Sequence, residues 1–491
     1  MGDMELDEFR KYGHQVIDWI ADYLAHPERY PVMSQVEPGW IRKNLPENPP
    51  EEPESMNVIL KDMEQYILPG ITHWNHPAFF AYFAISGSGP GILGELLSAA
   101  FNVNAMLWKT SPAATELEEV VLDWLRQMMG LSDSFIGIIN DTASVSTLCA
   151  MVAAREAITD FKTRSHGLTG HSKLPRLRLY TSEQAHSSVE KAAIVIGIGK
   201  EGVRKVSIDD EFRMDAEALK IAIKEDISNG WRPFSVVATV GTTSTTSIDP
   251  IMKIADICDE YKLWLHVDAA YAGTAAIIPE MRYVLDGCER ADSIVVNPHK
   301  WLFAPIDISA FYCRKPDILR RTFSLVPEYL KTNEENVVHN YMDYGIQLGR
   351  RFRALKLWMI IRYFGKIGII NRLSEHISMA REFTSWVDDS SNFERLAPVP
   401  FSVVCFRANP WVRKGRLIRN EDEEYLNTLN EKLLNEINAT GQTYLSHTYL
   451  RGKFTLRLAI GNIRTTREEV KKTWDLLQQY FVKLDKQLRP R

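Results

Sequence analysis

The sequence predicts an α/β fold built on a mainly parallel, doubly wound sheet. Short apolar runs rich in β-branched residues end on polar or small residues, which is typical of buried parallel strands. Segments with helical spacing separate these runs, as in repeated β–α units. The runs interpreted as strands are Phe135 to Ile139, Leu177 to Tyr180, Phe234 to Val240, Leu263 to Val267 and Ile294 to Val296. The intervening helices are expected at 141–157, 187–196 and 250–260.

Another helix of this region has clear start and stop signals. Ser111 is a capping residue, Pro112 stands at the first helical position, and Gly130 follows the last apolar position. A further long helix opens at 349–353 and runs through Ile361. Because the chain is longer than one core can support, we expect several domains, and residues 85–364 form the large α/β domain.

Residues 1–84 are expected to form a helical segment without a sheet of its own. Apolar residues recur at helical spacing in 5–26, and a second helix is expected at 56–67. The connector at 45–53 is too rich in proline for a helix or a central strand. Such helices cannot bury their apolar faces alone, so this segment must pack on another surface.

The pattern changes from about residue 365 onward. Helices there are expected at 366–388, 422–438 and 465–485, and strands at 401–407, 443–447 and 454–459. Helices beside short antiparallel strands are typical of an α+β domain. We therefore expect residues 365–491 to form a small C-terminal domain of this class.

Composition limits the classes of partner and compartment. The net charge is −5 with both signs interspersed, which argues against nucleic acid or an anionic membrane as the main partner. The five cysteines lack the paired spacing of a metal site or a disulfide framework, so we expect no metal and buried, reduced thiols. The N-terminus has no apolar signal core, and no stretch is long enough to span a bilayer. We expect a cytoplasmic protein.

A carboxylate and a lysine follow neighbouring strands and form the candidate site. The run Leu263 to Val267 ends on Asp268, and the run Ile294 to Val296 ends shortly before Lys300. Ligands of open α/β sheets bind beyond the carboxyl ends of the strands. The pair suits pyridoxal 5'-phosphate (PLP): Lys300 would bind the aldehyde as a Schiff base, Asp268 would keep the pyridine nitrogen protonated, and Ala270 would leave room for the ring. The alternative is a strand-end cap and a solvated lysine.

Small and hydroxyl residues open the helix after the first predicted strand. These residues are Thr142, Ala143 and Ser144. A helix N-terminus offers free N–H groups and the positive end of the helix dipole, which together suit the phosphate of PLP. The alternative for the same residues is ordinary N-capping.

The stretches HVDAAYAG (266–273) and NPHKW (297–301) resemble the group II PLP-dependent decarboxylases, most closely the aromatic L-amino-acid decarboxylases. The resemblance extends from about Leu6 to about Phe481, with the motifs in the family's order. It implies the PLP-dependent transferase fold type I, which is aspartate aminotransferase-like. It also implies α-decarboxylation of an aromatic L-amino acid, of the tryptophan or phenylalanine/tyrosine type, to the arylalkylamine and CO2.

The resemblance assigns further cofactor contacts. His186, in the context Glu-Gln-Ala-His-Ser-Ser, matches the histidine that stacks on the PLP ring, and imidazole suits a role that needs both proton states near neutral pH. Thr243 matches a threonine near a cofactor oxygen. Asn297 is expected to join the phosphate site, with His299 as a second contact.

The resemblance also implies a substrate pocket and a homodimer. Trp74, Tyr82 and Phe83 match the segment that lines the pocket. Asn104 and Met106 match a stretch that reaches the active site of the other subunit, near the substrate ring. Residues 1–84 correspond to a dimerisation segment that wraps the partner subunit, so the active site is expected at the subunit interface.

Position 85 bears on the choice of substrate. Ala84 stands where Pro is usual in animal members, and Ile85 stands where Thr is common. A threonine hydroxyl can hydrogen-bond a ring hydroxyl, and isoleucine cannot. We therefore expect an indole or an unsubstituted phenyl ring in preference to a catechol.

Residues 324–344 break the periodicity and are expected to form a catalytic loop. A long irregular segment in a compact domain is typically a lid or a linker. Tyr341 matches the catalytic tyrosine on such a loop and, working with His186, would return a proton to the substrate Cα. The alternative for Tyr341 is an aromatic residue at the rim of the site.

Two other functions remain open. Aldehyde synthases of this family oxidise the carbanion with O2 and typically carry Phe in place of the loop tyrosine, so Tyr341 favours simple decarboxylation. A catalytically silent PLP-binding homologue is the second alternative. Two departures from the family motivate this alternative. Asp141 stands where family members usually carry Gly, and Val145 stands where they often carry Glu. A carboxylate beside a phosphate is unfavourable unless it points away.

Overall fold

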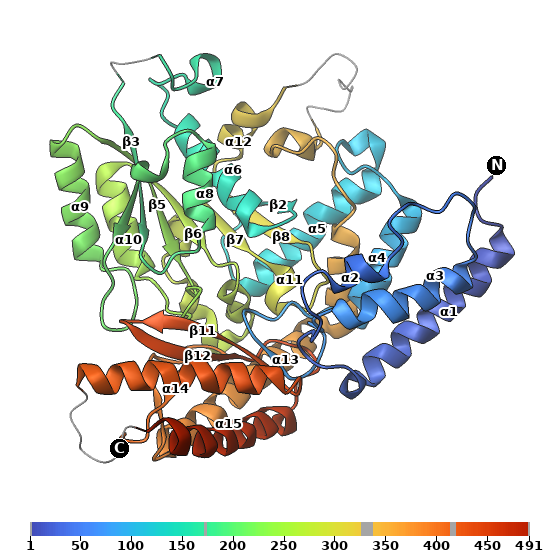
Figure 1. The fold of residues 1–491 in the computed structure, drawn as a ribbon. Helices are drawn as coiled ribbons and strands as arrows, with labels where there is room; N and C mark the ends of the chain where they lie inside the picture. The colour runs from blue at the N-terminus through green and yellow to red at the C-terminus, as the bar shows by residue number, and fades with distance from the viewer. Residues whose placement is uncertain (1, 171–173, 326–336, 413–418, 490–491) are drawn as a thin grey trace. The chain divides into compact units, whose positions relative to one another are not determined.

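The computed structural model describes residues 2–170, 174–325, 337–412 and 419–489. The chain divides into two units, each drawn in Figure 1. One unit comprises residues 85–381 and 397–404, and the other comprises 1–84, 382–396 and 405–491. The predicted three-part division at residues 84 and 364 stays a prediction. Of the predicted catalytic loop at 324–344, residues 326–336 lie outside the described ranges.

A seven-stranded sheet forms the centre of the 85–381 unit. Its order is β2-β8-β7-β6-β5-β3-β4. All neighbouring pairs are parallel except the two made by β8, so the predicted mainly parallel sheet is confirmed. The strands are β2 (Ile136–Asn140), β3 (Leu177–Ser182), β4 (Val203–Val206), β5 (Arg232–Thr239), β6 (Trp264–Asp268), β7 (Ser293–Val296) and β8 (Ser309–Cys313).

Two of these strands were not predicted. β4 lies at the edge of the sheet and carries Arg204 and Lys205, so it lacks a continuous apolar run. β8 is fully buried, but its antiparallel direction depends on β2 and β7, which are its neighbours in space. Pairing between distant segments of this kind cannot be read from local periodicity.

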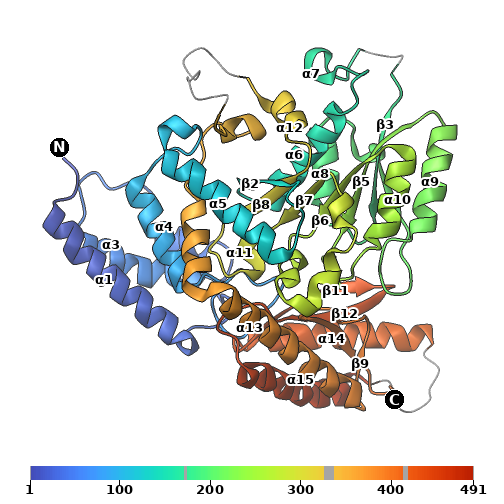
Figure 2. The same ribbon diagram turned by 180° about the vertical axis from the view of Figure 1, so that it is seen from behind.

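Helices cover both faces of this sheet. Side chains of adjacent residues on a strand point to opposite faces. On β2, Ile138 packs in the cluster that contains Cys149 of α6, whereas a Cβ at Gly137 would lie 2.7 Å from Leu122 of α5. Accordingly, α6 and α8 lie on the face seen in Figure 1, and α5 lies on the face seen in Figure 2. The helices are α4 (Gly89–Phe101), α5 (Pro112–Met129), α6 (Ala143–Glu156), α7 (Thr163–His166), α8 (Ser188–Val195), α9 (Ala216–Ser228), α10 (Ile251–Tyr261), α11 (Pro298–Trp301) and α12 (Pro316–Phe323).

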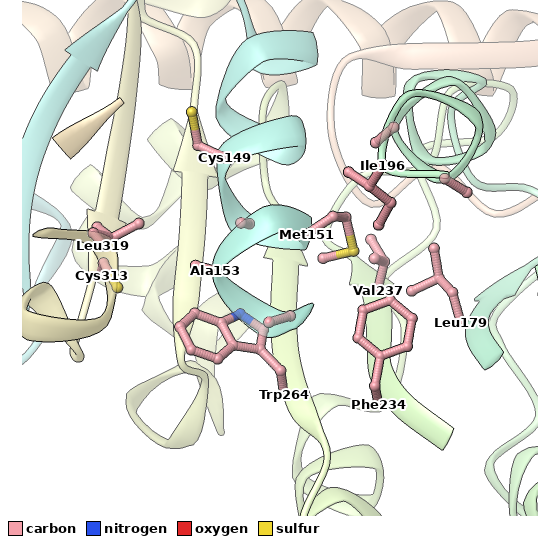
Figure 3. Close-up of a cluster of buried hydrophobic side chains, with 14 of the residues drawn as sticks. Cys149, Met151, Ala153, Leu179, Ile196, Phe234, Val237, Trp264, Cys313 and Leu319 are labelled. Carbon is pink, nitrogen blue, oxygen red and sulfur yellow. The ribbon is translucent and has the colours of Figure 1, made fainter. Parts of the chain in front are cut away.

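The core between α6 and the sheet is tightly packed. Figure 3 shows Cys149, Met151 and Ala153 of α6 beside Trp264 and other side chains from the strands. All five cysteines are free and buried, as predicted. Burial of this kind, worth roughly 25 cal/mol per Å² of apolar surface, holds α6 in place above the strands.

The predicted limits of α5 are confirmed in detail. The Ser111 side chain accepts a hydrogen bond from the Ala114 N–H, and Pro112 stands at the first helical position. Gly130 ends the helix with a φ of 77°, a left-handed conformation that favours glycine. The two helices predicted around residue 365 form α13 (Ala354–Asp389), which is interrupted at Gly365 by a φ of 63°.

The second unit is built on a five-stranded sheet of order β1-β11-β12-β10-β9. The β11–β12 and β9–β10 pairs are antiparallel, as predicted for the C-terminal part, and β1 adds a parallel pairing, Phe79 with Tyr444. Its elements are α1 (Leu6–Ala25), α2 (Trp40–Asn44), α3 (Met56–Asp62), β1 (Phe79–Phe80), β9 (Phe393–Arg395), β10 (Val403–Ala408), α14 (Asn420–Ala439), β11 (Tyr444–Leu450), β12 (Lys453–Ala459) and α15 (Arg467–Leu488).

Helix α1 buries none of its residues within the single chain. Leu6 and Phe9 are 77% and 61% exposed, although its apolar residues recur at helical spacing. An amphipathic helix gains most of its stability from packing its apolar face, and the start of this face is open to solvent within the described part of the chain. Across the described ranges, the helices fall short of the length and apolar character that a bilayer span requires.

Candidate active site

The ends of β5, β6 and β7 lie side by side and place the candidate residues on one edge of the sheet. Asp268, the last residue of β6, is in register with Thr239 of β5 and Val295 of β7. Beyond the strands, the Asn297 N–H donates to the Ala270 carbonyl at 3.0 Å. Asp268 and the NPHKW stretch therefore leave the sheet at the same edge, as the sequence predicts.

Lys300 lies on α11, the single helical turn that follows β7. Its backbone N–H donates to the Asn297 carbonyl at 3.0 Å, which fixes the turn. Burial lowers the pKa of the Lys300 amine, and the nearby Asp268 carboxylate raises it. Asp268 is 6% exposed, and one of its oxygens accepts the Ala270 N–H at 3.1 Å. Desolvation favours the neutral, nucleophilic form of a lysine amine, and the neighbouring carboxylate opposes this effect.

His186 shares the electrostatic environment of this pair. It follows β3, and its Nδ1 lies 2.9 Å from the Ser188 hydroxyl and accepts the Ser188 N–H at 3.1 Å. Burial lowers the pKa of His186, Asp268 raises it, and Lys300 lowers it. The structure thus brings His186, Asp268 and Lys300 together, although they are distant in sequence.

Asn297 and His299 line the same turn and are almost fully buried, at 2% and 4% exposure. The side-chain oxygen of Asn297 has no hydrogen-bond partner within the described part of the chain. His299 Nδ1 accepts the Ile308 N–H at 3.0 Å, and burial lowers the pKa of His299 to about 4, so the ring is neutral with Nε2–H as a donor. A buried polar oxygen without a partner is unusual and calls for an explanation, such as a bound group.

The N-terminus of α6 points to the same edge. β2 is antiparallel to β8, which is antiparallel to β7, so β2 ends where β7 ends. Thr142 occupies the N-cap position of α6, and Ser144 in its first turn is exposed. Both the Thr142 N–H and its hydroxyl donate to Asp141 Oδ1, at 2.6 and 3.2 Å. This contact was not predicted, because the sequence does not reveal where the Asp141 side chain points.

The loop after β5 approaches the neighbouring backbone closely. Gly241 has a φ of 88°, and a Cβ there would lie 2.5 Å from the Ala272 Cβ, so only glycine fits. Thr243, two residues later, is exposed. The residues around Asp268 fit a flat ring with an anionic group: a carboxylate and a lysine stand at one edge, Ala270 is small, and polar donors lie near by.

Tyr341 is buried rather than exposed on a loop. It opens a short 3₁₀ helix, Tyr341–Tyr344, and is 4% exposed. The Arg350 guanidinium carbon lies 4.7 Å from its ring centroid, and the His339 ring lies 6.2 Å away. Burial raises the pKa of Tyr341 well above its usual value of 10.

Tyr341 also lies near the opposite ends of the strands from Asp268 and Lys300. It lines a cavity together with Phe135 and Ile136, which precede or begin β2, and with Tyr312 near the end of β8. Asp268 and Lys300 lie beyond the other ends of these strands. The structure therefore does not bring Tyr341 together with His186 in this arrangement.

Asn104 and Met106 contact the segment that follows Tyr341. Asn104 Oδ1 accepts the Arg350 N–H at 2.9 Å, and the Met106 carbonyl accepts the Met342 N–H at 3.1 Å. Met106 packs against Leu107 and Met342. These contacts place both predicted substrate residues against the 340–350 segment.

Trp74, Tyr82 and Phe83 belong to the other unit, whereas Ile85 begins the 85–381 unit and is half-buried. The rings of Tyr82 and Trp74 stack with their centroids 5.7 Å apart. The Tyr82 hydroxyl lies 3.1 Å from the Tyr444 hydroxyl. The Arg457 guanidinium carbon lies 5.5 Å from the Phe83 ring centroid. Tyr444 was not predicted, because only the pairing of β1 with β11 places it beside Tyr82.

Comparison with known proteins agrees with this geometry. The pyridoxal-dependent decarboxylase conserved domain matches residues 38–409. Tyrosine decarboxylase 4 of Petroselinum crispum is 44% identical over 490 residues, which cover 98% of this chain and 94% of that protein. Phenylacetaldehyde synthase of a Rosa hybrid cultivar is 40% identical over 489 residues, which cover 97% of this chain and 94% of that one. The crystal structure of Oryza sativa TDC with PLP and tryptamine matches with a TM-score of 0.93 at 35% identity, over 99% of both chains.

The chain is thus a fold type I enzyme of the pyridoxal-dependent decarboxylase family, with PLP as its cofactor. Within that family it is an aromatic-L-amino-acid decarboxylase-like carboxy-lyase. Both decarboxylases and aldehyde synthases occur among its relatives at about this level of identity.

Proposed function

We propose that this protein removes the α-carboxylate of an aromatic L-amino acid and releases CO2 and the arylalkylamine. The observation that carries the proposal is the shared environment of Lys300, Asp268 and His186 at one edge of the sheet. PLP, when bound there, supplies an electron sink for the pair left at Cα as CO2 departs. This chain's residues position that group and control its protons.

Each of the three residues has a distinct task in this proposal. The amine of Lys300, with its pKa lowered by burial, is available as a nucleophile and releases the product. The carboxylate of Asp268 holds a proton on the pyridine nitrogen, which keeps the ring electron-poor. The imidazole of His186 would stack on the ring of bound PLP, beside the substrate carboxylate. Because burial lowers the pKa of His186, a neutral ring prevails at pH 7.

The phosphate is held in this proposal by the start of α6 and by the NPHKW turn. Thr142, Ala143 and Ser144 supply the helix N-terminus, and Asn297 and His299 supply buried polar atoms. Ala270 leaves room for the ring, and Thr243 lies near a cofactor oxygen. The unpartnered oxygen of Asn297 requires a donor, and a water held between this oxygen and the phosphate would supply one.

Tyr341 is proposed as the proton donor to Cα. In the described arrangement it lies at the far edge of the sheet, with a raised pKa that keeps its proton at neutral pH. The donor role therefore requires the segment around Tyr341 to change position, or Tyr341 to serve the site of a second copy. A change of position of this kind would also exclude water from the site, so that the proton comes from Tyr341.

The substrate is proposed to be aromatic. Trp74, Tyr82 and Phe83 supply stacking surfaces, and Asn104 and Met106 approach the ring of the substrate. Ile85 cannot hydrogen-bond a ring hydroxyl, which favours an indole or an unsubstituted phenyl ring over a catechol. The relatives span tyrosine decarboxylases and a structure with tryptamine, so they leave this choice to experiment.

We further propose a homodimer with the active site at the subunit interface. Among the described residues, Leu6 and Phe9 of α1 are 77% and 61% exposed, and Leu93, Leu96 and Phe101 of α4 are 47%, 51% and 57% exposed. Faces of this kind are typical of subunit interfaces. Residues 1–84 act as the dimerisation segment in this proposal.

An aromatic aldehyde synthase is the second candidate function, favoured by the similarity to phenylacetaldehyde synthase. In that reaction the amino acid, O2 and water would give aldehyde, ammonia, CO2 and hydrogen peroxide: O2 would take up two electrons, and water would supply the aldehyde oxygen. The presence of Tyr341 favours simple decarboxylation, because a proton donor shortens the lifetime of the carbanion.

One substrate panel tests the function. Tryptophan, phenylalanine, tyrosine and DOPA are incubated with the PLP-loaded protein, and CO2, amine, aldehyde and peroxide are quantified. The proposal expects CO2 and amine in equal amounts, highest for tryptophan or phenylalanine. Aldehyde with peroxide would identify the synthase, and PLP binding without CO2 from any amino acid would identify a silent homologue.

A matched pair of variants tests the role of position 85. Ile85→Thr introduces a hydroxyl and shortens the side chain, and Ile85→Val shortens it to nearly the same volume and shape without a hydroxyl. We expect Ile85→Thr to raise kcat/KM for DOPA relative to phenylalanine by about three- to tenfold. An equal effect of Ile85→Val would assign the change to pocket volume.

A further inference from the structure

The carboxylate of Asp141 occupies donors at the N-terminus of α6. Its Oδ1 accepts the Thr142 N–H at 2.6 Å and the Thr142 hydroxyl at 3.2 Å. These two donors belong to the residues that we propose as the phosphate cradle. An internal anion therefore engages two donors that the cofactor's phosphate would otherwise use.

Gln347 holds this carboxylate in place. Gln347 Nε2 donates to Asp141 Oδ2 at 3.0 Å, so both oxygens of the carboxylate are engaged. Gln347 belongs to the 340–350 segment, which is anchored in turn by the contact between Arg350 N–H and Asn104. The carboxylate is thus oriented by a partner 206 residues away and is not a freely rotating surface side chain.

We infer that Asp141 sets the affinity of this protein for PLP by competing with its phosphate. This inference rests on the proposed placement of the phosphate at Thr142–Ser144. Both the carboxylate and the phosphate dianion are favoured by the positive end of the helix dipole, and each repels the other at short range. The phosphate must displace the carboxylate from Thr142 or bind with only the remaining donors. Either course weakens cofactor binding relative to a chain with a neutral residue at 141.

The competition is electrostatic, so it depends on salt and on the phosphate. Asp141 is only partly buried, and its repulsion of a nearby dianion is reduced by screening ions. Pyridoxal, which has the same ring and aldehyde but no phosphate, does not meet this repulsion. The ratio of PLP affinity to pyridoxal affinity therefore reports on Asp141 separately from the rest of the site.

The test measures dissociation constants for PLP and for pyridoxal with cofactor-free protein, by equilibrium dialysis. Asp141→Asn removes the charge at constant shape, and Asp141→Ser keeps a capping oxygen in case the first variant folds poorly. Asp133→Asn is the control, because Asp133 is an exposed carboxylate that precedes the opposite end of β2. We expect Asp141→Asn to tighten PLP by about tenfold at low salt, with less gain at high salt. Pyridoxal affinity should stay within about twofold, and Asp133→Asn should match the wild type for both ligands.

Two results would overturn the inference. One is an unchanged or weaker PLP affinity in both Asp141 variants. The other is an equal tightening of PLP and pyridoxal, which would show that the phosphate is not the group that Asp141 opposes. A wild-type protein that binds no PLP at all would contradict the proposed function itself, and with it this inference.

Discussion

The carboxylate of Asp268 opposes the effect of burial on the pKa of the Lys300 amine. Burial lowers the pKa of Lys300, and Asp268, which ends the neighbouring strand, raises it. His186 responds to both charges, because Asp268 raises its pKa and Lys300 lowers it, while burial has the largest effect and lowers it. A cofactor that carries an aldehyde and a pyridine nitrogen can use the amine and the carboxylate at the same time.

Asp268→Asn should lower the rate of CO2 release by about 10²–10³-fold, because the amide cannot hold a charged pyridine nitrogen. Asp286→Asn, at an exposed acid in the same unit, serves as the control and should behave as the wild type. The measurement is single-turnover CO2 release with saturating PLP. A decrease of less than about threefold for Asp268→Asn would place the carboxylate away from the reacting ring.

Tyr341→Phe should shift the product from amine toward aldehyde and hydrogen peroxide. Loss of the donor lengthens the lifetime of the carbanion, and amine formation should fall by about a hundredfold. Tyr344→Phe is a matched control, since the ring centroids of Tyr344 and Tyr341 lie 6.4 Å apart in the same short helix. A peroxide yield that is equal in the wild type and in Tyr341→Phe would rule out the donor role.

Stability of the cofactor-free protein should fall between pH 6.5 and pH 5. Burial lowers the pKa of His266 and of His299 from 6.5 to about 4, so in this window the unfolded chain binds more protons than the folded one. Acid therefore favours unfolding, by about 2 kcal/mol for each histidine at pH 5. Asp249 acts in the opposite direction. Burial raises its pKa to about 6, so in this window the folded chain binds the extra proton, which offsets about 1 kcal/mol of the lost stability.

Urea denaturation at the two pH values measures this effect. His266→Asn should reduce the loss of stability by about 2 kcal/mol, whereas His14→Gln, at an exposed histidine, should leave it unchanged. If the free energy of unfolding depends on pH equally in His266→Asn and in the wild type, then His266 is not a source of the acid sensitivity.

Leu96→Asp should dissociate the proposed dimer. The side chain is 51% exposed in the single chain, and a buried unpaired carboxylate is costly at an interface. Ile221→Asp on α9 is the control, at 57% exposure. Light scattering coupled to size exclusion is expected to give the mass of one chain for Leu96→Asp and of two chains for the control. A wild-type mass of one chain would refute the dimer.

The sheet and its ligand edge could be predicted because buried strands carry a local signal. The runs that end at Asp268 and before Lys300 are continuous and apolar, and the rule for strand ends places them on one edge. The capped helix from Pro112 to Met129 was equally clear, because its signals lie in the residues themselves.

Contacts between distant segments could not be predicted. Gln347 meets Asp141 across 206 residues, and Tyr82 meets Tyr444 across 362. Both contacts depend on tertiary packing that local periodicity does not encode. The position of Tyr341 at the far edge of the sheet is a third example, since the resemblance implies a role for this residue but not its resting place.

Covalent trapping of the cofactor tests the central claim most directly. The PLP-loaded protein is reduced with borohydride and digested, and the peptides are identified by mass spectrometry. We predict a pyridoxyl group on the peptide that contains Lys300, and none on that peptide in Lys300→Arg. A protein that releases CO2 yet carries the label on a different lysine, or on none, would contradict the account.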